Sequence, residues 1–248
     1  MTTTGVTFQS HGQQLVGRWW QAKGEGAKPT MILLHGLPGI DQNHDLAHAL
    51  KYAGWNSLVF HYRGCWGSEG DYSLHQVLPD VTAILDEMSQ WPEVDENQIY
   101  LFGHSMGGWA SLMTGAQDSR IKGVVSAAGV IDWQKILPST VDPAVLEQMK
   151  AFFEETMVPY LDGMTLDKLI NEFQELPSVF DVSDQFNGRP LLLICGEKDA
   201  EHHMSQAALL HERCPGHSEY VVVPDADHGF SWERDELIGL VLGWVKRL

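Results

Sequence analysis

Short apolar runs alternate with helical patterns along nearly the whole chain, and this alternation limits the folds available to it. The apolar runs lie at residues 29–35, 56–60, 98–102, 123–128, 190–195 and 220–223. Helical spacing of apolar residues lies between or after them, at residues 45–53, 77–88, 109–116 and 236–246. Strands that are apolar on both faces need helices on both sides, which predicts an α/β fold with a mostly parallel sheet. Residues 6–8 and 14–20 predict an antiparallel hairpin before it, giving about eight strands in all.

One long segment interrupts the alternation. Residues 132–187 contain helical patterns at 145–153 and 166–173 but no run typical of a strand. The segment is too long for an ordinary connection between a strand and a helix. We therefore expect an inserted helical cap at 132–187 and an α/β core made of residues 1–131 and 188–248. The segment has 11 acidic and 3 basic residues, and its net charge of −8 predicts a preference for neutral or cationic substrates.

Charge and cysteine content exclude several classes of function. The 248 residues carry a formal net charge of −17, which argues against a nucleic-acid or anionic-membrane partner, because both require a basic surface. Cys65, Cys195 and Cys214 show no metal-binding spacing, so we expect reduced thiols, no metal and no cofactor. No signal peptide and no apolar run of about 20 residues is present, so a cytoplasmic location is expected.

The sharpest motif is Gly103-His104-Ser105-Met106-Gly107-Gly108, which directly follows the apolar run at 98–102. A serine on a tight turn from a strand to a helix projects its hydroxyl above the sheet, and the flanking glycines permit the close backbone approach that such a turn needs. Ser105 is therefore the candidate nucleophile. His104 beside it is expected to be a packing residue rather than a second base.

A serine nucleophile needs a base, and the base needs an acid that orients it. His228 follows the last apolar run, and Asp199 follows the run before it, so the order along the chain is Ser, Asp, His, which is the order expected on this fold. All three lie at the carboxyl ends of predicted strands and can converge. Glu197 is the nearest rival of Asp199, whereas Asp227 adjoins His228 and is expected to shape the loop.

Two backbone N–H groups are expected to form an oxyanion hole. The N–H of Met106 follows the nucleophile at a helix N-terminus, where the helix dipole favours an anion. The second donor should come from the loop His35-Gly36-Leu37-Pro38-Gly39, in which Pro38 has no N–H and Leu37 is the best candidate.

Five segments together resemble the α/β-hydrolase superfamily: HGLPG, HYRGCWGSEG, GHSMGG, GEKD and DADHGF. The second segment resembles a loop of serine-aminopeptidase-like and acyl-peptidase-like hydrolases that small cinnamoyl and feruloyl esterases share. The resemblance implies a hydrolase that acts through an acyl-enzyme, with Ser105, Asp199 and His228 in the triad positions. It covers nearly the whole chain but does not separate the subfamilies.

The favoured function is hydrolysis of small to medium acyl or aryl carboxylic esters, with a small-molecule ester as the partner. An aminopeptidase, acyl-peptidase or thioesterase with the same triad stays open, and a non-catalytic binding protein on this fold is a remote alternative. The pair His202-His203 is expected to be solvated rather than metal-binding. The oligomeric state is open, with a homodimer as one candidate.

Overall fold

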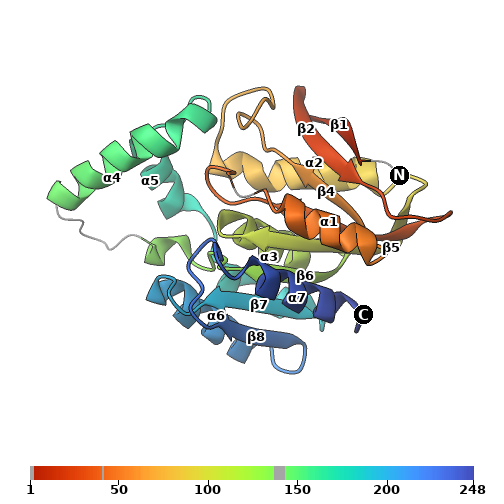
Figure 1. Ribbon diagram of the computed structural model, residues 1–248. Coiled ribbons are helices and arrows are strands. Elements are labelled where there is room, and N and C mark those ends of the chain that lie inside the picture. Colours follow the sequence, from red (N-terminus) through yellow and green to blue (C-terminus); the bar gives the residue numbers. More distant parts are fainter. Residues whose placement is uncertain (1–2, 41, 137–142) are drawn as a thin grey trace.

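The protein is described by a computed structural model that covers residues 3–40, 42–136 and 143–248. Its sheet has eight strands in the order β1-β2-β4-β3-β5-β6-β7-β8 (Figure 1). The bounds are β1 Thr3–Ser10, β2 Gln13–Trp20, β3 Lys28–Leu34, β4 Asn56–Phe60, β5 Val94–His104, β6 Ile121–Ala127, β7 Leu191–Gly196 and β8 Ser218–Val223. The pairs β1/β2 and β2/β4 are antiparallel and the others parallel, which confirms the predicted fold class.

Burial along the strands follows from their place in the sheet. Every residue of β4 and β7 is buried, as expected for central parallel strands with helices on both faces. The edge strand β1 instead keeps exposed side chains. His11 and Gly12 join β1 to β2, and both have positive φ, at 49° and 82°. That pair of angles belongs to the tight hairpin turns whose twist matches the strands.

Helices cover both faces of the sheet. Helices α1 (His44–Tyr52) and α7 (Arg234–Val245) contribute to one apolar cluster, which lies on one face. Helices α2 (Val77–Met88), α3 (Met106–Gln117) and α6 (Glu201–Arg213) contribute to the larger cluster on the other face. The sequence did not predict α6, because His203 and Gln206 occupy two of its buried positions and blur the apolar spacing.

The segment between β6 and β7 is helical where the structure describes it. It contains η2 (Trp133–Lys135), α4 (Pro143–Thr156), η3 (Val158–Tyr160), α5 (Leu166–Glu175) and η4 (Val179–Phe186). Helices α4 and α5 extend away from one end of the sheet (Figure 1). Residues 137–142 of the predicted cap lie outside the described residues. That 132–187 form a separate cap remains a prediction.

A buried carboxylate fastens this segment to the core. Glu172 of α5 is buried and accepts hydrogen bonds from the Ser73 hydroxyl at 2.8 Å and the Leu74 N–H at 2.7 Å. Lys168 donates to the Tyr72 carbonyl at 2.8 Å. Removing one partner of such a buried pair leaves a desolvated charge, so these bonds hold α5 in one place.

None of the helices in the described part of the chain is long and apolar enough to cross a membrane.

The turn between β5 and α3 depends on direct backbone packing. A Cβ on Gly103 would clash with the Gly107 carbonyl, and a Cβ on Gly107 would clash with the Leu34 carbonyl of β3. The first turn of α3 therefore lies against the ends of β3 and β5 at a distance that only glycine allows.

Three histidines are buried, two of them where strands end and one in a helix. Burial lowers the pKa of His35, His104 and His203 to about 4, so their rings are neutral at pH 7. His35 and His104 end or follow β3 and β5, and His203 is in α6. The unfolded chain binds protons at these positions near pH 6.5, whereas the folded chain does not until about pH 4.

Replacing Gly107 by Ala should lower the free energy of unfolding by about 3 kcal/mol, because the added methyl group has no space against Leu34. Gly239→Ala in α7 is the matched control, since a Cβ there meets no atom within 4 Å. It should raise stability by about 0.5–1 kcal/mol. Urea unfolding of both variants measures this, and equal effects would contradict the close-packing account.

Stability should fall between pH 7 and pH 5. Each of the three histidine rings should contribute a loss of about 2 kcal/mol, because the unfolded state takes up a proton that the folded state refuses. Their contribution is complete above pH 6.5 and disappears as the pH falls toward 4. Urea unfolding at several pH values measures the slope. The variant His104→Gln should have a shallower slope, and a slope equal to that of the wild type would contradict the assignment.

Candidate active site

Ser105 sits at the head of α3 in a strained backbone conformation. Its φ is 56° and its ψ is −120°, a combination that costs a residue with a side chain about 1–3 kcal/mol. The Ser105 N–H donates to the Ala127 carbonyl at 3.0 Å, and its carbonyl accepts from Gly108 at 2.9 Å and from Val130 at 3.1 Å. These bonds fix the turn from both sides, so the residue that the motif singled out lies on the expected strand-to-helix turn.

The structure brings Asp199 and His228 together. Nδ1 of His228 is 3.0 Å from both carboxylate oxygens of Asp199. The Asp199 side chain is 3% exposed and that of His228 is 42% exposed. Burial alone would raise the pKa of Asp199, but the hydrogen bond and charge of His228, with smaller contributions from His203 and the Ala200 N–H, together lower it. An ionised Asp199 accepts a hydrogen bond from the N–H at Nδ1, which leaves Nε2 of His228 as the free acceptor.

The two neighbouring carboxylates have other partners. Glu197 accepts the Asp225 N–H at 3.0 Å, within the turn that precedes His228. Asp227 accepts the Ser231 N–H at 2.8 Å and so closes the loop on the other side of His228. Both side chains shape the loop that carries the histidine, and neither is hydrogen-bonded to its ring.

His104 joins the serine turn to the histidine loop. Its Nε2 donates to the His228 carbonyl at 2.7 Å, and the two rings lie 5.1 Å apart. In the described part of the chain, no hydrogen bond joins the Ser105 hydroxyl to His228. In unliganded hydrolases this bond is often longer than in the substrate complex. His104 is buried, as expected of a packing residue. Its hydrogen bond to the His228 loop was not predicted, because the sequence shows only that His104 is next to Ser105.

The loop after β3 lies directly against Ser105. A Cβ on Gly36 would be 2.9 Å from the Cβ of Ser105, so the Gly36 backbone faces the serine. His35 Nδ1 lies 2.8 Å from the Gly36 carbonyl, which can only accept. That carbonyl and the Leu37 N–H belong to one peptide group, so His35 sets the direction of the predicted oxyanion donor. Met106 is the first residue of α3, where an N–H has no partner within the helix.

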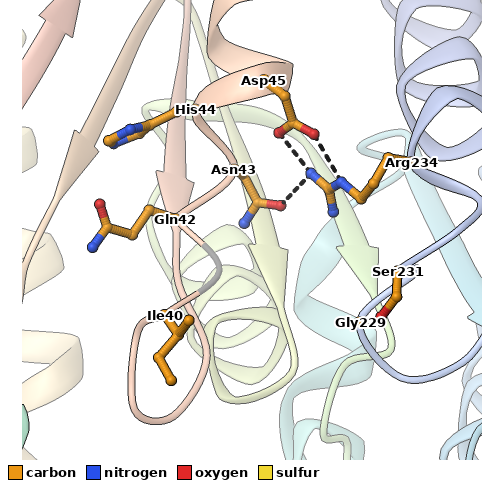
Figure 2. A pocket seen from close by; sticks show the side chains of 8 residues that line it. All are labelled: Ile40, Gln42, Asn43, His44, Asp45, Gly229, Ser231 and Arg234. Carbon is orange, nitrogen blue, oxygen red and sulfur yellow. Dashed lines mark hydrogen bonds and ion pairs between the residues drawn. The ribbon is translucent and has the colours of Figure 1, made fainter.

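A second tie holds the histidine loop to α1 (Figure 2). Arg234, at the start of α7, donates to both carboxylate oxygens of Asp45, at 2.7 and 2.8 Å, and to the Asn43 side chain at 3.0 Å. These groups line an open cavity of about 510 Å³, together with Ile40, Gln42, His44, Gly229 and Ser231. Arg234 was not predicted, because its partners are about 190 positions away in the chain.

The prediction that His202 and His203 are both solvated is wrong for His203. His203 is buried, and donor atoms of Asp199, His203 and His228 lie within 4.8 Å of one another, a set that could hold a metal ion. The rings of His203 and His228 are 4.9 Å apart and tilted by 37°, close to a stacked arrangement. A shared ion must lie in the plane of each imidazole, so the rings would have to rotate to hold one. His203 instead packs against the face of His228.

Residues 46–248 match the prolyl oligopeptidase family. Among curated proteins, the quorum-quenching protein AidA of Acinetobacter baumannii is 29% identical over 133 residues, covering 51% of this chain and 44% of AidA. The uncharacterized protein YfhR of Escherichia coli O157:H7 is 26% identical over 205 residues, covering 82% and 64%. The chain thus spans less than two thirds of the length of these relatives.

Solved structures share the fold over the full length. The α/β hydrolase GrgF from Penicillium sp. sh18 superposes with a TM-score of 0.79 and 18% identity, covering 100% of this chain and 99% of GrgF. Est1E from Butyrivibrio proteoclasticus, solved with ferulic acid bound, gives 0.78 and 18% identity, covering 98% of both chains. The family match and the shared fold agree with the serine turn and the Asp–His pair described above. The chain therefore belongs to the prolyl oligopeptidase family and has the α/β-hydrolase fold.

Proposed function

We propose that the protein hydrolyses carboxylic esters through an acyl-enzyme on Ser105. The observation that carries the proposal is the His228–Asp199 contact of 3.0 Å, in a loop that His104 ties to the turn bearing Ser105. A serine at the head of a helix, a base with one free nitrogen and an acid that orients the base are the parts that acyl transfer requires.

In the first half of the proposed reaction, Ser105 Oγ attacks the ester carbonyl while Nε2 of His228 takes its proton. Asp199 keeps the proton on Nδ1 and stabilises the imidazolium. The N–H groups of Leu37 and Met106 donate to the oxyanion. When the tetrahedral intermediate collapses, the bond to the leaving oxygen breaks and His228 gives that oxygen its proton, which releases the alcohol.

In the second half, His228 takes a proton from water, and the hydroxide attacks the acyl-enzyme carbonyl. The second tetrahedral intermediate uses the same two N–H groups. Its collapse returns the proton to Ser105 Oγ and releases the carboxylic acid, so the enzyme is regenerated without a cofactor.

The apolar surroundings support an acyl or aryl group of modest size. Trp133 stacks on Phe173 of α5 at 4.7 Å and meets Trp109 of α3 edge-on at 5.7 Å, so aromatic rings join the cap to the helix that follows Ser105. Ferulic acid, which Est1E binds, is a ligand of this size and character. The proposed cap at 132–187 would enclose the acyl group, and its net charge of −8 favours neutral or cationic esters.

Membership of the prolyl oligopeptidase family supports a second candidate, an aminopeptidase or acyl-peptidase that uses the same groups. The chemistry at Ser105 would be identical, with an amine in place of the alcohol.

A cytoplasmic location is supported by the three free and buried cysteines, Cys65, Cys195 and Cys214.

Ser105→Ala should lower kcat/KM for p-nitrophenyl acetate by a factor on the order of 10⁴ or more, because the nucleophile is removed.

Asp199→Asn should lower the same kcat/KM by a factor on the order of 10³ to 10⁴, because the amide no longer fixes the proton on Nδ1 of His228. Glu197→Gln is the matched control and should stay within about tenfold of the wild type. A larger loss for Glu197→Gln than for Asp199→Asn would contradict the proposed triad.

The substrate class separates the two candidates. We expect kcat/KM for p-nitrophenyl esters, from acetate to octanoate and including a feruloyl ester, to exceed that for aminoacyl- and N-acyl-aminoacyl-anilides by at least about a hundredfold. An alcohol leaving group needs less help from His228 than an amine. The comparison uses one preparation, with Ser105→Ala as the blank. A preference for anilides would replace the esterase proposal with the peptidase.

A further inference from the structure

Trp66 connects two parts of the candidate site that are far apart in the sequence. Its indole N–H donates to the Pro38 carbonyl at 2.7 Å, and its ring stacks on Tyr160 at 4.5 Å with an angle of 14° between the planes. Pro38 belongs to the loop that carries the predicted oxyanion donor Leu37, and Tyr160 ends η3 in the segment predicted as the cap. One side chain therefore contacts both.

The backbone of Trp66 is strained, which indicates that its place is imposed by its surroundings. Its φ is 50°, a value that costs a bulky residue about 1–3 kcal/mol. Cys65 pairs with Leu161 through an isolated antiparallel bridge, and Asp162 donates to Gly64 at 2.8 Å. Backbone contacts with the two residues that follow η3 thus hold the turn that presents Trp66.

The loop after β3 is clamped between two rings. A Cβ on Gly39 would be 2.8 Å from the Trp66 indole nitrogen and 2.8 Å from the imidazole of His35. His35 holds the peptide group between Gly36 and Leu37, and Trp66 holds the Pro38 carbonyl two residues further along. The Leu37 N–H belongs to the first of these groups, and only Leu37 and Pro38 connect it to the second, so a shift of the Pro38 carbonyl is transmitted to it.

We propose that Trp66 is a positioning residue that couples the oxyanion loop to the cap. Its indole N–H fixes the Pro38 carbonyl and so keeps the Leu37 N–H aimed above Ser105. Its stack on Tyr160 makes that aim depend on the position of η3. The inference deepens the proposed function and rests on it, because the oxyanion arises only in acyl transfer.

The variant Trp66→Phe tests the indole bond, since the phenyl ring keeps the stack on Tyr160 and loses the N–H. With p-nitrophenyl acetate, whose acyl group is too small to need the cap, kcat should fall about tenfold while KM stays within about twofold. The inhibition constant of a trifluoromethyl ketone, which forms a tetrahedral adduct with the serine, should rise by the same factor of about ten. An unchanged kcat and inhibition constant would overturn the inference.

The control is Trp20→Phe. Trp20 is buried, whereas Trp66 is 36% exposed; the indole nitrogen of Trp20 has no hydrogen-bond partner in the described structure, and its ring lies in the smaller apolar cluster, on β2. Because Trp20 is the more buried of the two, the control sets an upper bound on what the loss of an indole ring costs without the loss of a hydrogen bond. Its kcat and inhibition constant should stay within about twofold of the wild type. A tenfold loss in both variants would assign the effect to general destabilisation and overturn the inference.

Tyr160→Ala tests the coupling to the cap, because it removes the stack and keeps the indole. It should lower kcat for the acetate ester about threefold, and the double variant Trp66→Phe, Tyr160→Ala should be no worse than Trp66→Phe alone, since both act through one contact. If the loss of kcat in the double variant equals the product of the two single losses, the coupling is overturned.

Wild-type protein that neither turns over the ester nor reacts with a fluorophosphonate would overturn the proposed function itself. Normal wild-type activity with an unaffected Trp66→Phe overturns the positioning role alone.

Discussion

The rest of the structure depends on the close contact between the first turn of α3 and the ends of β3 and β5. Gly103 and Gly107 permit backbone distances that no larger residue allows. That contact leaves Ser105 no relaxed conformation, so its backbone stays at a φ of 56° with its side chain held at the carboxyl end of the sheet. The strain is tolerated because the Ser105 N–H donates to Ala127 and the Ser105 carbonyl accepts from Gly108 and Val130, which fixes the turn. The position of Ser105 is thus a property of backbone packing and not of the serine side chain.

Around this turn, the two loops that serve the proposed chemistry are held by specific side-chain hydrogen bonds. His104 holds the loop of His228 through its carbonyl, and Arg234 holds the end of that loop to Asp45. His35 and Trp66 hold the loop that carries Leu37. These bonds link strands, helices and loops from the whole length of the chain. Burial keeps His35 and His104 neutral, so they act as fixed donors that do not change charge at neutral pH.

The alternation of apolar runs and helices predicted the sheet, and the GHSMGG motif after a strand predicted the turn at Ser105. Both signals are local, so one sequence suffices to read them. The ties between loops could not be predicted, because Arg234 and Asp45, or Trp66 and Tyr160, meet only after the chain has folded. Helix α6 was missed for a related reason: its buried face includes His203 and Gln206, whose partners are Gly129 and Asp132 in the loop after β6. The prediction that His202 and His203 are both solvated was wrong for His203, because His203 lies on the buried face of α6.

The proposed function requires that an acyl group passes through Ser105. Intact-protein and peptide mass spectrometry of the protein, quenched in acid within the first turnovers of p-nitrophenyl acetate, tests this step. We predict a mass increase of one acetyl group, confined to the peptide that contains Ser105 and absent once substrate is exhausted. Turnover of the ester without any adduct at Ser105, or with an adduct on another residue, would contradict it.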